Sequence, residues 1–143
     1  MIRILHALAV QRSPADVFGY LVEPANFPAW QAGVVEVKSE GKTGLGATFT
    51  EVRTFLGQRA ESTLEVTEYR PNERFSLRVV SGPWLFEILH DLASVGTGTR
   101  LEVILQGETK GRLRLAAPML EHAVRTDLEG NLATLKSMLE TGR

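Results

Sequence analysis

The chain has 143 residues, of which 43% are hydrophobic and 23% charged, and its formal net charge is −1 at pH 7. A chain of this length is expected to form one domain, residues 1–143, with a core of its own. The balanced charge offers no basic surface for nucleic acid, so we expect no nucleic-acid partner. The sequence contains no cysteine, which excludes disulfides, thiolate nucleophiles and cysteine-bound zinc.

The N-terminal segment, residues 1–9, shares some features with a signal peptide. It carries Arg3 and an Ala-x-Ala triplet, but His6 interrupts an apolar stretch that is shorter than the usual ~7–15 residues. No apolar run reaches the ~18 residues that predict a membrane span. We therefore interpret the segment as a strand and predict a cytoplasmic protein.

The first predicted elements are a strand and two short helices. Alternating apolar residues predict the strand over residues 2–11. Ser13 and Pro14 are typical of a helix N-cap and first helical position, so a short helix follows directly. Pro24 and Pro28 mark a second short helical segment that ends near Trp30.

From residue 33 to residue 107 the sequence indicates strands separated by turns. Residues 70–73 and 95–98, for example, are rich in the Gly, Pro and Asn typical of turns. Short turns join strands in antiparallel fashion, so we predict a meander. The predicted strands are residues 34–40, 47–56, 58–69, 74–81, 84–94 and 98–107.

The C-terminal segment predicts a long amphipathic helix, because apolar residues recur every three or four positions. These residues are Ala117, Leu120, Val124, Leu128, Leu132, Leu135 and Leu139. The order of elements predicts an α+β fold, in which a curved antiparallel sheet of about seven strands wraps a long C-terminal helix. A helix lying across a curved sheet need not fill the space beneath it, which favours a cavity.

Five segments along the chain carry a resemblance to a known family. They are Ser13-Pro14-Ala15-Asp16-Val17-Phe18, Pro28-Ala29-Trp30, Val66-Thr67-Glu68-Tyr69-Arg70-Pro71, Gly98-Thr99-Arg100-Leu101 and the final amphipathic helix. In this order they resemble the START/SRPBCC helix-grip superfamily, and specifically its small polyketide cyclase/dehydrase-like members. The resemblance covers nearly the whole chain and implies a helix-grip fold. It does not select a function, because the family includes cyclases, lipid carriers and hormone receptors.

Motifs for catalysis, metals and cofactors are missing from the sequence. Residues 41–43 look like the end of a phosphate-binding loop, but Glu36 stands where its first glycine belongs. His6, His90 and His122 fall on three different predicted elements and lack the spacing of a metal site. We therefore expect no metal and no cofactor.

Side-chain alternation in the predicted strands indicates which residues face the cavity. One face of each of the four strands from residue 58 to residue 107 is apolar, with a few polar groups. The residues predicted to bind the ligand are Trp30, Phe75, Leu77, Trp84, Phe86, Ile88, Leu101 and Val103. Simple packing of the second short helix is an equal alternative for Trp30. We expect the mouth near the two short helices and the N-terminal half of the long helix.

His90 is the first candidate for chemistry, because alternation places it on the inward face of its strand. Its imidazole suits general acid–base catalysis or a hydrogen bond to a ligand. It also suits a core histidine bonded to a backbone carbonyl or a neighbouring side chain, and this interpretation is favoured.

Arg53 is the second candidate, and its strand leaves two orientations open. If Phe49 and Phe55 face inward, Glu51 and Arg53 enter the cavity together. Buried charges are rare and costly, which favours the orientation that places both in solvent. Inside the cavity, Arg53 would pair with an enolate, carboxylate or phenolate of the ligand.

Three functions are compatible with this sequence. The leading hypothesis is a binding module for a small hydrophobic or aromatic molecule. The alternative is a polyketide-type cyclase, aromatase or dehydratase without metal or cofactor, in which His90 moves a proton and Arg53 stabilises an enolate. The third is a co-chaperone or protein-interaction domain, for which the sequence shows no apolar patch or basic groove. The sequence predicts no oligomeric state.

Overall fold

The computed structural model describes residues 1–39, 41–109 and 111–141. Across these residues seven strands form one antiparallel sheet in the order β1-β7-β6-β5-β4-β3-β2. The strands are β1 (Ile2–Val10), β2 (Val34–Ser39), β3 (Thr48–Phe55), β4 (Gln58–Arg70), β5 (Arg74–Ser81), β6 (Phe86–Val95) and β7 (Gly98–Gly107). The helices are α1 (Pro14–Leu21), α2 (Phe27–Trp30) and α3 (Ala117–Glu140), with 3₁₀ segments η1 (Pro24–Asn26) and η2 (Gly111–Ala116).

This architecture confirms the predicted fold class. The structure has the antiparallel sheet, the two short helices after the first strand and the long C-terminal helix. The predicted strands 74–81 and 98–107 agree with β5 and β7 at both ends. The predicted strand 84–94 begins two residues too early, because Gly82 (φ 151°) and Pro83 hold the chain in a bend before β6.

The short helices form as their sequence signals require. The Ser13 side-chain oxygen accepts a hydrogen bond from the Asp16 backbone N–H at 3.2 Å, and Pro14 opens α1. Helix α1 then buries Val17, Phe18 and Leu21 against the sheet. None of the helices in the described residues is long and apolar enough to cross a membrane.

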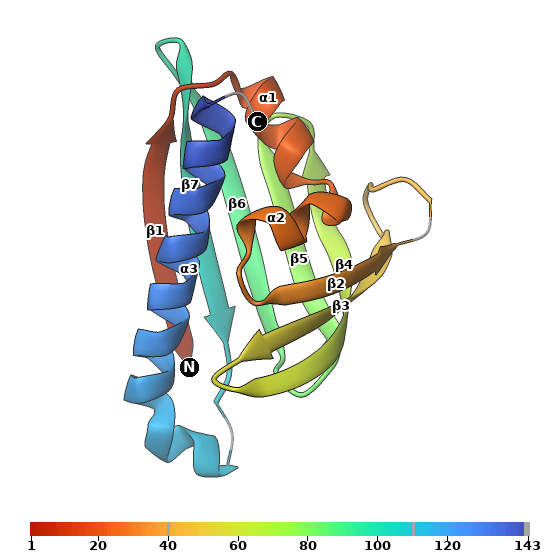
Figure 1. Ribbon diagram of the computed structural model, residues 1–143, viewed down its shortest axis with the longest axis vertical. Coiled ribbons are helices and arrows are strands. Elements are labelled where there is room, and N and C mark those ends of the chain that lie inside the picture. Colours follow the sequence, from red (N-terminus) through yellow and green to blue (C-terminus); the bar gives the residue numbers. More distant parts are fainter. Residues whose placement is uncertain (40, 110, 142–143) are drawn as a thin grey trace.

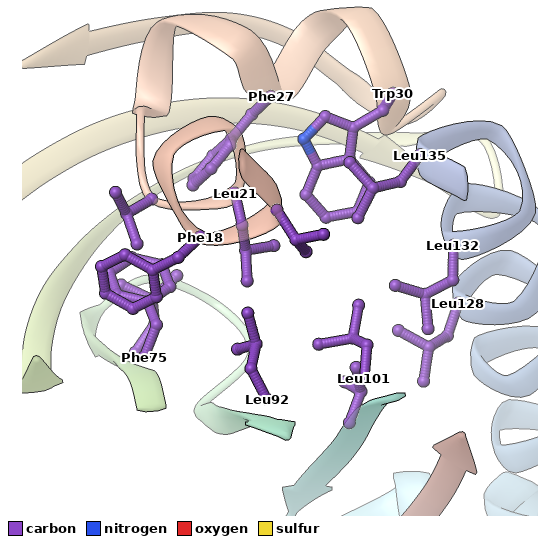
Figure 2. Close-up of a cluster of buried hydrophobic side chains, with 14 of the residues drawn as sticks. Phe18, Leu21, Phe27, Trp30, Phe75, Leu92, Leu101, Leu128, Leu132 and Leu135 are labelled. Atoms are coloured by element: carbon purple, nitrogen blue, oxygen red, sulfur yellow. The ribbon is translucent and has the colours of Figure 1, made fainter. Parts of the chain in front are cut away.

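Helix α3 lies along β1 and reaches α2 (Figure 1). Its predicted apolar stripe is buried at Leu128, Leu132, Leu135 and Leu139. Figure 2 shows Leu128 and Leu132 pointing from α3 toward the side of the cluster that contains Leu101, and Leu135 pointing toward the Trp30 ring. The N-terminal part of the stripe, at Leu120 and Val124, is only partly buried.

The sheet curls because its strands are irregular at defined points. The register between β4 and β5 shifts at Thr63/Leu64 and again at Val66/Glu68. Such bulges increase twist and bend a strand. The second bulge also turns Tyr69 inward, where its ring packs edge-on to that of Phe18, with 5.3 Å between the ring centres. As a result, β2 and β3 run across the direction of β5 to β7 and close one side of the concave face (Figure 1).

Candidate ligand cavity

A cavity of about 370 Å³ lies between the concave face of the sheet, α2 and α3. This volume falls in the range of small-molecule sites, roughly 300–1,000 Å³. Most of its wall is apolar. The apolar side chains come from the sheet, the short helices and α3. They include Leu21, Phe27, Trp30, Phe55, Leu64, Phe75, Leu77, Trp84, Phe86, Ile88, Leu105, Leu120, Val124, Leu128 and Leu132.

Most of the residues singled out in the sequence lie in this wall. Those that line the cavity are Trp30, Arg53, Phe75, Leu77, Trp84, Phe86, Ile88 and His90. Leu101 and Val103 do not line it, although both are fully buried. They sit in β7 opposite Leu92 and His90 of β6, and Figure 2 shows Leu101 facing the leucines of α3, which cover this part of the sheet.

The mouth of the cavity differs in part from the prediction. The most exposed residues of the wall are Pro83, Leu85 and Glu108, which lie before β6 and after β7. The start of β6 and the end of β7 lie at the same end of the molecule as the first turns of α3, as expected (Figure 1). The short helices are not at the mouth. They close the opposite end, because Trp30 of α2 is packed into the core with only 4% of its surface exposed.

The solvent-facing orientation favoured for Glu51 and Arg53 is wrong. Glu51 is 2% exposed, and both residues line the cavity together with Phe55. Burial is possible because the charges are paired: Arg53 Nε donates to Glu51 Oε1 at 3.1 Å. Phe49, on the same face of β3, packs edge-on to Phe27 of α2 at 5.5 Å.

Three further side chains complete a polar cluster, defined as Gln31, Glu51, Arg53, Asp127 and Asn131, all in the cavity wall. Arg53 Nη2 donates to Gln31 Oε1 at 2.5 Å, and Arg53 Nη1 lies 3.9 Å from Asp127 Oδ2. Asn131 Nδ2 donates to the same Asp127 oxygen at 3.4 Å. The cluster therefore joins β3, the loop after α2, and α3.

Backbone contacts hold the loop after α2 against both neighbours. The Ala32 N–H donates to Asn131 Oδ1 at 3.1 Å, and the Thr54 N–H donates to the Gly33 carbonyl at 2.8 Å. A side chain at Gly33 would place its Cβ 2.7 Å from the Thr54 carbonyl oxygen, so glycine is needed for this approach. Sequence reasoning missed Gln31, Asp127 and Asn131. The one available signal was Asn131, a polar residue within the apolar stripe of α3.

His90 lies in the wall on β6 and is 3% exposed. Its Nδ1 is 2.9 Å from the Phe75 carbonyl oxygen. Its ring stacks on the Phe75 ring, with 5.8 Å between the ring centres. A carbonyl can only accept, so the hydrogen resides on Nδ1 and the Nε2 of the neutral ring is an acceptor. Burial lowers the pKa of His90 to about 4, against smaller opposing effects of the Phe75 carbonyl and Asp91. The ring is therefore neutral at pH 7.

His90 and Arg53 approach the cavity from different stretches of the sheet. His90 pairs with Phe75, which pairs with Tyr69 of β4. Arg53 pairs with Ala60, nine positions before Tyr69 on the same strand. The two side chains therefore belong to different strands, β6 and β3, of one cavity wall.

The curled sheet, the long C-terminal helix and the cavity between them define a helix-grip domain. Residues 1–140 match the sequence model of the family described as polyketide cyclase / dehydrase and lipid transport. The chain belongs to this family, and its fold is the helix-grip fold that the resemblance in the sequence implies. No curated protein matches the sequence.

Solved structures share the fold at low sequence identity. The protein TTHA0849 of Thermus thermophilus is 14% identical, with 98% of each chain covered and a TM-score of 0.85. A START superfamily protein of Mycobacterium smegmatis is 16% identical, with 100% of each chain covered and a TM-score of 0.83. The Aha1 dimer of Colwellia psychrerythraea is 20% identical, with 100% of this chain and 99% of that chain covered and a TM-score of 0.72. At these identities the likeness concerns the fold alone.

Proposed function

We propose that the protein binds a small hydrophobic or aromatic molecule in the cavity between the sheet and α3. The observation that carries this proposal is the cavity of about 370 Å³, whose wall is mainly aliphatic and aromatic. Pockets of this size, with a few polar groups to orient the ligand, are typical of small-molecule sites. Membership of a family that includes lipid transport supports the same function.

The geometry favours binding over cyclase or dehydratase chemistry. The enzymatic alternative requires Arg53 to stabilise an enolate while His90 moves a proton. Arg53 already donates hydrogen bonds to Glu51 and Gln31 and lies 3.9 Å from the Asp127 carboxylate, so the protein itself balances its charge. His90 retains one acceptor nitrogen, which suits a hydrogen bond to a ligand.

Filling the cavity should weaken the binding of a neutral fluorescent probe. We expect N-phenyl-1-naphthylamine to bind saturably, with its emission rising in the apolar site. Ile88→Phe adds volume inside the wall and should weaken this binding more than about tenfold, at a stability cost of about 1–3 kcal/mol for overpacking. Fluorescence titration measures the affinity, and thermal unfolding measures the stability.

The matched control is Leu89→Phe, the same kind of change at the next residue of β6. Leu89 is outside the cavity wall and alternates to the opposite face of the sheet, where it pairs with Ser76 and Ile104. The Leu89→Phe variant should bind N-phenyl-1-naphthylamine with the affinity of the wild type. Equal weakening in both variants, or no saturable binding by the wild type, would contradict the proposed function.

A further inference from the structure

Glu51 presents an acceptor to the cavity that the protein leaves unused. Its side chain is 3% exposed and lines the wall, and its Oε1 accepts from Arg53 Nε. Among the described residues no hydrogen-bond donor reaches Oε2, and this atom is not sealed beneath other atoms as Trp30 Nε1 is. A ligand donor that reaches this carboxylate oxygen would form a charge-assisted hydrogen bond, which is about twice as strong as one between neutral groups.

The charges around Arg53 disfavour an anionic ligand. Its Nε and Nη2 donate to Glu51 and Gln31 at 3.1 and 2.5 Å, and its Nη1 lies 3.9 Å from the Asp127 carboxylate, an ion pair without a hydrogen bond. In the polar cluster two carboxylates therefore surround one guanidinium. A ligand carboxylate entering this part of the wall would add a third negative charge beside a single positive one, next to Glu51, whose side chain is only 3% exposed, and like charges repel more strongly where water is partly excluded.

The remaining polar atoms of the wall suit a group that both donates and accepts. Gln31 uses Oε1 to accept from Arg53, which leaves its amide N–H groups as donors. His90 adds an acceptor at Nε2 in another part of the same wall. A hydroxyl can donate to Glu51 and accept from Gln31, whereas a carboxylate can only accept.

We propose that the cavity selects neutral hydroxylated ligands over carboxylates, with Glu51 as the acceptor of the ligand hydroxyl. This inference rests on the proposed ligand binding and specifies the chemical class of the ligand. An aromatic or polycyclic alcohol or phenol fits the apolar wall and the polar cluster together. A fatty acid or aryl carboxylate fits the apolar wall only.

Three probes with one ring system test this selection at pH 7. They are 2-naphthol, which is neutral and carries a hydroxyl donor, 2-methoxynaphthalene, which lacks the donor, and 2-naphthoate, which is ionised. Each competes with bound N-phenyl-1-naphthylamine in a calorimetric titration. We expect 2-naphthol to compete at a concentration at least about tenfold lower than 2-naphthoate, and also lower than 2-methoxynaphthalene.

Glu51→Gln tests the assigned residue, since it removes the charge and keeps an oxygen that can accept from Arg53. In this variant we expect the preference for 2-naphthol over 2-naphthoate to fall about tenfold, mainly because 2-naphthoate binds better. The control is Glu61→Gln, which removes an exposed carboxylate of β4 outside the cavity wall. It should keep the wild-type preference.

The outcomes separate this inference from the proposed function. If the wild type binds N-phenyl-1-naphthylamine but 2-naphthol is not the best competitor, the selection for hydroxyl donors is wrong and the binding cavity stands. This order in the wild type decides the point even if Glu51→Gln does not fold. An unchanged preference in a folded Glu51→Gln variant overturns the assignment to Glu51. Absence of saturable N-phenyl-1-naphthylamine binding overturns the proposed function itself.

Discussion

Lowering the pH from 7 to 4 should remove about 3 kcal/mol of unfolding free energy through His90 alone. Burial lowers the pKa of this residue from 6.5 to about 4 in the folded protein. In the unfolded chain the imidazole binds its proton near pH 6.5, whereas in the folded chain it remains neutral until about pH 4. Between these values the unfolded state holds more protons, so stability falls as the pH falls.

Urea unfolding at a series of pH values measures this effect. Other groups also contribute, since the pKa values of Glu68 and Glu140 are lowered in the folded protein. The contribution of His90 is therefore the part of the pH dependence of the unfolding free energy that the wild type shows and His90→Gln lacks. His122→Gln, at an exposed position of α3, should keep the wild-type pH dependence. The same dependence in His90→Gln and wild type would show that His90 is not buried as a neutral ring.

The periodic features of the chain were predictable from the sequence. Alternation along residues 74–81 identifies Phe75 and Leu77 as inward-facing, because successive side chains of a strand point to opposite faces. The apolar spacing of the last segment likewise identifies the buried side of α3. These patterns follow from local geometry, and they are why the sheet, the helices and most of the apolar wall could be placed.

The polar cluster was not predictable, because its energetics depend on partners far apart in the chain. Alternation left two orientations for Glu51 and Arg53, and the general cost of burying charge favoured the wrong one. That cost is offset by pairing between the two residues and by contacts with Gln31 and Asp127, which lie on other elements. Neither contact has a signature in sequence spacing. The same holds for the mouth, whose place depends on how tightly Trp30 packs into the core.

Helix α3 should contribute a large part of the stability through single leucines, and Leu135→Ala tests this most directly. Leu135 is fully buried but does not line the cavity, so its removal leaves a new void in close-packed surroundings. Large-to-small changes of this kind cost about 2–5 kcal/mol, from lost burial and from the void. The urea midpoint should fall accordingly, with an unchanged dependence on urea concentration.

The matched control is Thr134→Ala, one residue earlier on the exposed side of the helix. It removes a hydroxyl that donates to the Gly130 carbonyl at 3.1 Å, and it should change stability by no more than about 0.5 kcal/mol. The contrast between neighbouring positions isolates burial from helix propensity, since both variants introduce alanine. A loss below about 1 kcal/mol in Leu135→Ala would contradict the packing of α3 on the sheet. Because Leu135 lies outside the cavity wall, the affinity for N-phenyl-1-naphthylamine should be retained in the folded fraction.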